Sequence, residues 1–265
     1  MTGLALSSDL KYYVRPGWTV HYLPRTESTN NVAVAAGQQG TPGKLLVITD
    51  EQTSGRGRLN RRWNAPVGDC LLMSLLLYPP PPFERNAGRV TMACGLALCE
   101  AIVATTEVPA VLKWPNDLIV NDVQGGWRKI AGMLSEIGLR DGLPHFVVVG
   151  IGLNVNVPVA TLSELSPNAT SLLAETGRQV ERTALLDAFL SRVETLYRRL
   201  ERGEDLLPLW RAHLAWKGQS VRLQTPTKIV EGVFEDVDEA GALWVRLSSG
   251  ERRCFMVGDV TLRRA

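Results

Sequence analysis

A loop rich in arginine and glycine is the segment of this chain best suited to chemistry. It places four arginines within seven residues and contains no acid after Glu51 to neutralise them, in the run Gln52-Thr53-Ser54-Gly55-Arg56-Gly57-Arg58-Leu59-Asn60-Arg61-Arg62-Trp63. Guanidinium groups donate several hydrogen bonds to phosphate or carboxylate oxygens, and glycines 55 and 57 let the backbone approach a ligand. A solvated basic loop would have a similar composition. Because this loop lies between apolar strands, we interpret it as a site for anions, with Trp63 placed to stack on a base or cover the pocket.

Three further segments carry polar groups at places where apolar residues surround them. Lys113-Trp114-Pro115-Asn116-Asp117 sets an acid and an amide at a turn, although a plain turn would explain Pro-Asn-Asp by itself. Lys129 opens an otherwise apolar strand, either to meet a ligand or as a charge that protects a sheet edge. Gly150-Ile151-Gly152-Leu153-Asn154-Val155-Asn156 combines glycines with two amides, which suits a ribose or a carbonyl, or else marks a bulge.

Alternating and continuous apolar runs predict the elements that position these residues. Strands are expected at 18–24, 45–49, 71–78, 108–113, 118–121, 129–137 and 145–156, and helices after Ser28-Thr29-Asn30 and at 88–105, 183–202 and 206–216. Ser28 supplies the chemistry of a helix N-cap. Several strands are apolar throughout, which predicts that both of their faces are covered. The fold class is therefore α+β or α/β with a mixed sheet.

The C-terminal part of the chain has a different pattern. After Gly218, short alternating strands follow one another around turns at 239–241 and 249–250, which predicts a small barrel. We expect one large domain over residues 1–216 and a small one over 217–265.

Composition excludes several classes of protein. The chain has 265 residues and a formal charge of +2, so no strong global field attracts nucleic acid or membrane. The four cysteines and three histidines are too dispersed for a structural zinc site, and Cys94 and Cys99 are expected to be buried in a helix. No signal peptide and no apolar run of roughly 20 residues is evident, which predicts a cytoplasmic location.

Taken together, five motifs resemble the biotin protein ligases, over residues 22 to the C-terminus. The motifs occur in that family's order: Ser28-Thr29-Asn30, Gly55-Arg56-Gly57-Arg58 with Arg61 and Trp63, Lys113-Trp114-Pro115-Asn116-Asp117, Lys129-Ile130-Ala131-Gly132 and Gly152-Leu153-Asn154-Val155-Asn156. The resemblance implies a catalytic domain related to the class II aminoacyl-tRNA synthetases, followed by an SH3-like barrel. It further implies an ATP-dependent enzyme that makes biotinyl-5′-AMP and transfers biotin to a lysine of a biotin carboxyl carrier domain, with ATP, Mg²⁺ and biotin required.

The resemblance also implies a role for each matching residue. Biotin would be contacted by Ser28, Thr29, Asn30, Gln52, Gly55, Arg56, Gly57, Arg58, Lys129 and Gly132. ATP would be contacted by Arg56, Arg58, Arg61, Trp63, Asn116, Lys129 and Asn154. Within these sets, Arg56 and Arg58 would hold the carboxylate and α-phosphate, Arg61 the departing phosphates, and Trp63 would lie near the adenine. The catalytic residues would be Lys129, Arg58 and Asp117, with Asp117 acting in lysine transfer or in positioning magnesium.

This sequence departs from the family pattern in two places. Asn60 stands where a glycine is more usual, and asparagine can adopt the left-handed conformation at moderate cost, so the loop path is expected to survive. The segment 157–161, which in relatives belongs to a loop that closes over the adenylate, does not align with the family pattern, although 169–172 would be its far end.

Three other functions remain open at this point. A lipoate ligase would share the fold and the adenylation chemistry, but it uses a different glycine-rich segment. A DNA-binding repressor is disfavoured, because the 27 residues before Ser28 show no recognition helix. A non-catalytic binding or scaffold protein would not need the arginines. For self-association, monomer and dimer both remain open, and the apolar strand at 145–155 is a candidate edge for a dimer.

Overall fold

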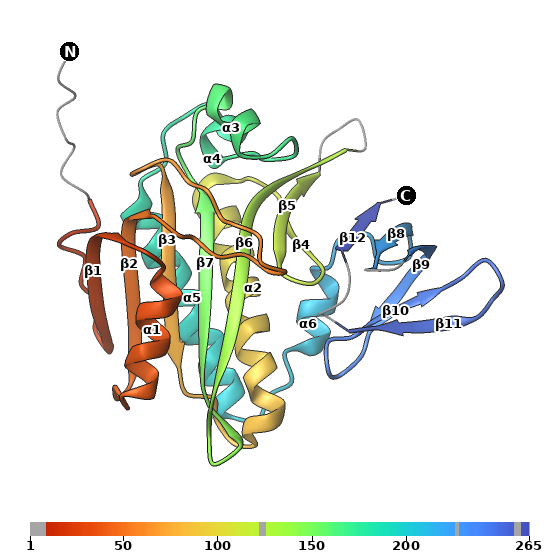
Figure 1. Ribbon diagram of the computed structural model, residues 1–265, viewed down its shortest axis with the longest axis horizontal. Coiled ribbons are helices and arrows are strands. Elements are labelled where there is room, and N and C mark those ends of the chain that lie inside the picture. Colours follow the sequence, from red (N-terminus) through yellow and green to blue (C-terminus); the bar gives the residue numbers. More distant parts are fainter. Residues whose placement is uncertain (1–8, 122–125, 226–227, 257–260, 265) are drawn as a thin grey trace.

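Two sheets make up the architecture of the computed structural model, which describes residues 9–121, 126–225, 228–256 and 261–264 (Figure 1). The seven-stranded sheet has the order β1-β2-β3-β7-β6-β5-β4. Its strands are β1 (Trp18–Thr26), β2 (Lys44–Gln52), β3 (Cys70–Leu77), β4 (Ala110–Lys113), β5 (Asp117–Asn121), β6 (Trp127–Arg140) and β7 (Leu143–Asn154). Only β1 and β2 pair in parallel, and the other neighbours of this sheet are antiparallel, so the predicted mixed sheet is confirmed.

Helices cover both faces of this sheet, as the apolar strands predict. Helix α1 (Thr29–Gln38) lies on one face, and α2 (Phe83–Thr106) and α5 (Arg182–Glu201) lie on the other (Figure 1). In β2, Leu46 and Ile48 belong to the large core with α2 and α5, whereas Leu45 and Val47 pack with α1. Successive side chains of a strand point to opposite faces, so a continuous apolar run is what a strand covered on both sides requires.

Helix α2 is longer than predicted and passes through the interior. Its stretch Arg85–Thr106 is long and apolar enough to cross a membrane by length and composition, although no uninterrupted apolar run of that length was expected. In this structure 72% of its most apolar window is buried. Cys94 and Cys99 lie on it and are buried, as predicted. The helix packs against α5 and the sheet, which accounts for its apolar composition without a membrane.

The remaining helices are short. They are α3 (Val159–Leu165), α4 (Leu172–Thr176) and α6 (Leu207–Ala212). The sequence pattern did not predict α3 and α4, because they are too brief to establish an apolar periodicity. The helix expected at 206–216 ends four residues earlier than predicted, at Ala212.

A second sheet follows at the C-terminus. Its order is β11-β10-β9-β8-β12, formed by β8 (Ser220–Gln224), β9 (Ile229–Val237), β10 (Leu243–Arg246), β11 (Arg252–Phe255) and β12 (Thr261–Arg264). All of its neighbouring strands are antiparallel. The two sheets meet at the turn after β4, where the buried Trp114 donates its Nε1 hydrogen to the carbonyl of Gly241 at 2.9 Å.

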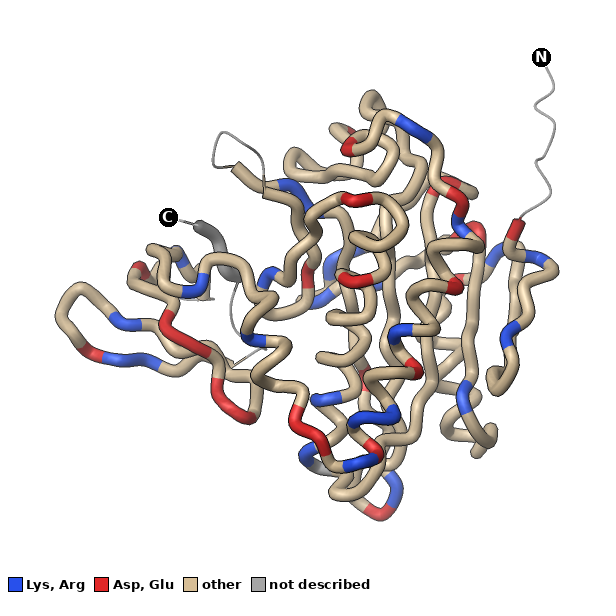
Figure 2. The backbone as a smooth tube through the Cα atoms, turned by 180° about the vertical axis from the view of Figure 1, so that it is seen from behind, with Lys and Arg blue, Asp and Glu red and all other residues tan. Residues whose placement is uncertain are grey.

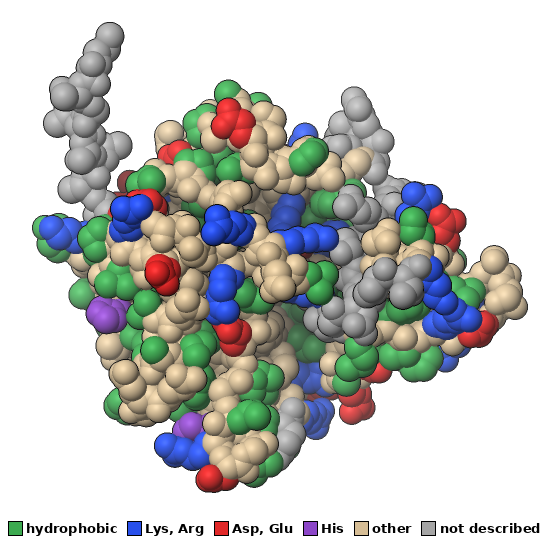
Figure 3. All heavy atoms as spheres, in the orientation of Figure 1, with side chains coloured by type: hydrophobic (Ala, Val, Ile, Leu, Met, Phe, Trp, Pro, Cys, Tyr) green, Lys and Arg blue, Asp and Glu red, His purple; other side chains and the backbone are tan. Residues whose placement is uncertain are grey.

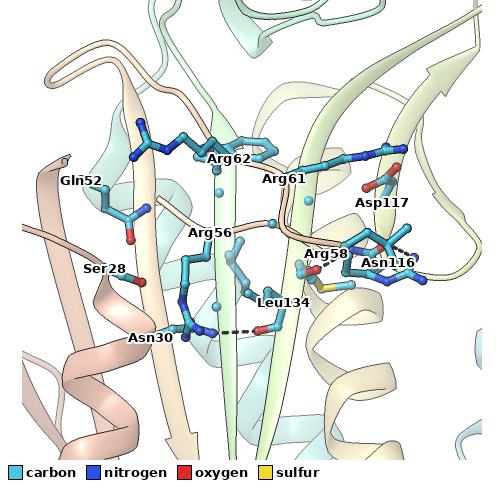
Figure 4. A pocket seen from close by; sticks show the side chains of 18 of the residues that line it. Ser28, Asn30, Gln52, Arg56, Arg58, Arg61, Arg62, Asn116, Asp117 and Leu134 are labelled. Carbon is cyan, nitrogen blue, oxygen red and sulfur yellow. Dashed lines mark hydrogen bonds between the residues drawn. The ribbon is translucent and has the colours of Figure 1, made fainter. Parts of the chain in front are cut away.

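Two predictions about local structure are wrong. The strand at 145–155 is not an edge, because β7 is paired with β3 on one side and with β6 on the other. Ser28 does stand at the N-cap of α1, but its side chain makes no capping hydrogen bond. Its hydroxyl faces the cavity described below instead (Figure 4).

Candidate functional site

The position of the site follows from a change of residue size along β7. Phe146 and Val148 pack under α1, but the next two positions on the same face are Gly150 and Gly152. A Cβ on Gly150 would lie 1.9 Å from Oδ1 of Asn30, and one on Gly152 would lie 2.3 Å from the Trp63 ring. The glycines therefore admit a helix end and a tryptophan directly onto the sheet, and a cavity forms between them.

The basic loop crosses over this face as a small hairpin. Arg56 bridges Arg62, the amide of Gly57 donates to the carbonyl of Arg61 at 2.7 Å, and the amide of Trp63 donates to that of Gly55 at 2.9 Å. Leu59 and Asn60 form its tip with φ of 55° and 58°. Asn60 thus adopts the left-handed conformation that was predicted for it, and Leu59 shares it.

At Gly55 the close neighbour in this structure is the backbone of the loop itself. A Cβ at this position would lie 2.3 Å from the carbonyl oxygen of Trp63, so the glycine allows the two arms of the hairpin to approach each other. Gly55 is not among the residues that line the cavity, whereas Gly57 is.

The first cavity lies beneath this hairpin and collects most of the predicted site residues (Figure 4). Predicted residues in its lining are Ser28, Thr29, Asn30, Gln52, Arg56, Gly57, Arg58, Arg61, Trp63, Asn116, Asp117, Lys129 and Gly132. Met133, Leu134 and Ile151 add apolar wall. Asn154 is instead found in a second cavity, on the other side of Trp63.

We call the part of the first cavity formed by Ser28, Thr29, Asn30 and Gln52 the α1 end. Its polar groups are bonded mainly to one another. The Gln52 carbonyl accepts from the amide of Thr29 at 2.9 Å and from its hydroxyl at 3.2 Å. The hydroxyl of Ser74 donates to Asn30 Oδ1 at 2.6 Å and lies 2.7 Å from Thr29 Oγ1. These contacts leave the amide nitrogen of Gln52 and the hydroxyl of Ser28 directed toward the cavity (Figure 4).

We call the opposite part, formed by Lys113, Asp117 and Lys129 with Arg58 and Arg61, the lysine end. Asp117 accepts from Lys129 Nζ at 2.5 Å and from Lys113 Nζ at 3.2 Å. Lys113 is buried, with its ammonium 5.1 Å from the Trp127 ring centre and 5.9 Å from that of Trp216. Lys129 is one-third exposed and lies 5.3 Å from the ring of Trp63. One lysine is thus fixed among aromatic rings, and the other faces the cavity.

Burial and charge set the protonation state of this end. Burial alone would raise the pKa of Asp117, but Lys129 and Lys113 more than offset it, so the pKa lies below its ordinary value and the carboxylate is ionised at neutral pH. Burial lowers the pKa of Arg58, with Asp117 acting in the opposite direction. A guanidinium remains charged at neutral pH even so.

The arginines of the loop point in different directions (Figure 4). Arg58 donates to the amide oxygen of Asn116 at 3.0 Å, and Asn116 donates in turn to the carbonyl of Met133 at 2.5 Å. Arg61 and Arg62 lie at the mouth, and among the described residues neither has an acid within 4.0 Å. Figure 3 shows Lys and Arg side chains gathered around the hollow of this face, whereas basic and acidic residues are interspersed along the backbone seen from behind (Figure 2).

The second cavity shares Arg61, Trp63 and Lys129 with the first. Its far wall is the segment after α3, where the amide of Lys129 donates to the carbonyl of Asn168 at 2.6 Å and Lys129 bridges Ala169. Asn154 is buried and donates to the carbonyl of Thr170 at 2.9 Å. Its side chain therefore holds the segment 169–172 at Thr170, and this segment is the one predicted to be the far end of an adenylate-covering loop.

Sequence reasoning did not single out every residue that shapes the site. Lys113 was recognised within its motif but given no role, although it lines both cavities. Ser74 and Glu136 were missed. Ser74 lies within an apolar run, and Glu136 lies in the part of β6 where polar and apolar residues alternate, as they do in a strand with one face in solvent. The described residues contain no group of three or more His, Cys, Asp or Glu side chains placed to hold a metal.

Comparison with protein families finds two matches along the chain. Residues 22–154 match the biotin/lipoate A/B protein ligase family, and residues 218–263 match the biotin protein ligase C terminal domain. The first match spans half of the chain and contains all of the motif residues of the first cavity.

Individual relatives agree with these matches. The biotin--[acetyl-CoA-carboxylase] ligase of Paracoccus denitrificans is 32% identical and aligns over 87% of this chain and 95% of its own length. The bifunctional ligase/repressor BirA of Bacillus subtilis is 29% identical over 86% of this chain and 69% of its own length. Among solved structures, the Aquifex aeolicus biotin protein ligase in complex with biotin and ATP has a TM-score of 0.75 at 26% identity, covering 93% of this chain and 99% of that one.

Proposed function

Because the chain belongs to the biotin/lipoate A/B protein ligase family, we propose that it is an ATP-dependent biotin protein ligase. It joins biotin to AMP and then transfers the biotinyl group to a lysine of a carrier protein. The names of the relatives favour the biotin carrier domain of acetyl-CoA carboxylase as the acceptor.

The observation that carries this proposal is the contrast in charge within the first cavity. Biotin has an uncharged, hydrogen-bonding ring system at one end and a carboxylate at the other. Gln52 and Ser28 at the α1 end offer uncharged polar groups to the ring system (Figure 4). Arg58 and Lys129 at the lysine end offer cations to the carboxylate and to the α-phosphate of ATP.

The chemistry needs positioning more than it needs a nucleophile from the enzyme. An oxygen of the biotin carboxylate attacks the α-phosphorus of ATP, a new P–O bond forms, and the bond to the β-phosphate breaks to release pyrophosphate. Arg58 and Lys129 bring the two anions together and stabilise the charge that develops, and Arg61 faces the departing phosphates. The acceptor amine then attacks the acyl carbon, and AMP leaves. We assign Asp117, held ionised by its two lysines, to orienting that amine.

Magnesium accompanies ATP in this proposal, but Asp117 does not fit as its ligand. One carboxylate oxygen contacts Lys129 and the other contacts Lys113. Mg²⁺ in nucleotide sites is commonly held through phosphates, waters and one or two carboxylates. We therefore propose that it enters on the phosphates.

Finer features of the architecture are also part of the proposal. We propose a catalytic domain over 1–216 of the class II aminoacyl-tRNA synthetase type and an SH3-like barrel over 217–265. The mixed sheet with helices on both faces and the five antiparallel C-terminal strands support this division. A cytoplasmic location agrees with an ATP-dependent enzyme that modifies a carboxylase.

A mass measurement on the acceptor tests the function. A biotin carrier domain is incubated with the protein, ATP and either biotin or lipoate, and its intact mass is recorded. We expect a gain of one biotinyl group with biotin, none with lipoate, and none when ATP is omitted. A gain with lipoate alone would replace the biotin ligase with a lipoate ligase, and no gain with either acid would refute both.

A further inference from the structure

An acidic residue, Glu136, stands just outside the lining of the first cavity and pairs with the lining residue Arg56. Glu136 lies on β6 opposite Val148, which is in turn opposite Leu76 on β3. Val148 and Leu76 belong to the apolar cluster under α1. Paired residues of antiparallel strands share a face, so Glu136 extends an apolar row with a carboxylate. A carboxylate in such a row needs partners.

Its partners come from α1 and from the basic loop. Glu136 Oε2 accepts a hydrogen bond from Asn30 Nδ2 at 2.8 Å and forms an ion pair with Arg56 Nη2. The second Asn30 Nδ2 hydrogen goes to the carbonyl of Leu134 at 3.1 Å. Arg56 therefore points down toward Asn30 and away from Arg58, as Figure 4 shows. Its guanidinium and the amide of Asn30 thus share one oxygen of Glu136.

Asn30 fixes the position of this pair. Its Oδ1 accepts from Ser74 at 2.6 Å, and a Cβ on Gly150 would come within 1.9 Å of that oxygen. Asn30 is 4% exposed, and both hydrogens of its side-chain amide are donated in hydrogen bonds. Glu136 is thus held by a buried amide that has no room to shift, while its own side chain and that of Arg56 remain 32% and 40% exposed.

Glu136 neutralises the charge of Arg56, and this affects which substrates can bind. Without Glu136, Arg56 would bring an uncompensated cation to the α1 end, beside Gln52 and Ser28. A carboxylate would then be attracted to both ends of the cavity, because cations would stand at each. With the ion pair in place, the charge of Arg56 is neutralised, and the excess positive charge lies at the lysine end and at the mouth of the cavity, where Arg62 stands.

We propose that Glu136 is a specificity-determining residue that sets the direction of substrate entry. By pairing with Arg56 it reserves the α1 end for an uncharged head group and excludes acids that carry a second carboxylate. This inference rests on the proposed function and adds a residue and a substrate rule to it. The class of ligand admitted is a monocarboxylic acid with an uncharged polar head.

Glu136→Gln tests the inference because it removes the charge and keeps the shape. Biotin-dependent exchange of pyrophosphate into ATP is measured in the presence of pimelate, a straight-chain dicarboxylate. We expect the inhibition constant of pimelate to fall about tenfold and the KM for biotin to rise by a similar factor, as loss of a charged hydrogen bond predicts. The KM for ATP at saturating biotin should change little.

The matched control is Glu51→Gln. Glu51 pairs with Arg25 at 3.1 Å and its side chain is 31% exposed, close to the 32% of Glu136, but its partner Arg25 lines neither cavity, whereas Arg56 lines the first. We expect this variant to keep the wild-type values. Equal changes in both variants would mean a general effect of losing a carboxylate, and unchanged pimelate inhibition in Glu136→Gln would overturn the inference.

A double variant identifies Arg56 as the group that Glu136 neutralises. In Arg56→Met with Glu136→Gln both charges are absent, so the added inhibition by pimelate should disappear even though biotin binds more weakly. Persistent inhibition would contradict the assignment. This variant also keeps the idea testable if the single substitution fails to fold. Absence of exchange in the wild-type protein would instead refute the proposed function.

Discussion

The two ends of the first cavity are both lined by polar side chains, but they differ in how those side chains are partnered. At the α1 end, Thr29, Asn30 and Gln52 are bonded to one another or to the sheet. At the lysine end, Asp117 is the one acid in the cavity lining and faces several cations. Hydrogen bonds within the α1 end thus give a fixed shape that suits an uncharged group, whereas the surplus positive charge of the lysine end attracts anions.

Removing the partly exposed Lys129 should have the largest effect on activity. In Lys129→Ala, adenylate formation is expected to slow by about 10²–10³, because one preorganised cation is lost where charge develops. The measurement is pyrophosphate release with biotin and ATP, and circular dichroism should show an unchanged fold. Arg128→Ala is the control, since Arg128 pairs with Glu175 and lines neither cavity. Near-normal release in Lys129→Ala would remove the lysine end from the mechanism.

Filling the sheet beneath the α1 end should cost stability. In Gly150→Ala the new Cβ meets Asn30 Oδ1, and we expect a loss of about 1–3 kcal/mol of unfolding free energy, the usual range for overpacking. Gly88→Ala is matched to it, because Gly88 lies in α2 with nothing within 4 Å of a Cβ. That change should stabilise by roughly 0.5–1 kcal/mol. Chemical denaturation measures both, and equal responses would show that the α1 end is not tightly packed.

Loosening the turn that carries Asn116 and Asp117 should have a smaller effect. Trp114→Phe deletes the hydrogen bond from Nε1 to the carbonyl of Gly241, worth about 0.5–1.5 kcal/mol. Because that bond ties the turn to the C-terminal sheet, the rate of adenylate formation should fall with it. Trp244→Phe, whose longer 3.3 Å bond to Asp238 lies within the C-terminal sheet, should change stability without changing the rate. Unaltered adenylation in Trp114→Phe would separate the turn from the lysine end.

The tip of the loop should give the smallest effect. Asn60 has φ of 58°, which glycine adopts without a steric penalty, so Asn60→Gly should change stability by less than about 1 kcal/mol and leave adenylation intact. Asn60→Val should be clearly worse, because a β-branched residue resists that conformation. Thermal unfolding and pyrophosphate release compare the two. If valine were tolerated as well as glycine, the loop would not keep this path in solution.

The sequence allowed much of this arrangement to be predicted, for physical reasons that differ between residues. The runs in β2 and β7 are apolar because both faces are covered, so the strands could be placed from composition. The central position of β7 could not, since pairing partners depend on contacts distant in sequence. Asn60 was placed correctly because its backbone conformation is a local property.

The same distinction applies to the site. Lys129 and Asp117 come together because the bulged pairing of β5 with β6 sets them near each other, which no local pattern encodes. Gly55 was predicted to let a ligand approach, and its contact with the carbonyl of Trp63, across the hairpin, could not be foreseen from the sequence. Glu136 was missed because an acid in an alternating strand reads as a surface residue, and only the folded chain brings Arg56 to it.

The most direct test of the account is pyrophosphate exchange into ATP with purified protein, with biotin or lipoate supplied as the sole carboxylic acid. We predict exchange that requires biotin, is lost in Lys129→Ala and is retained in Arg128→Ala. Exchange that proceeds without biotin, or equally well in Lys129→Ala, would contradict it.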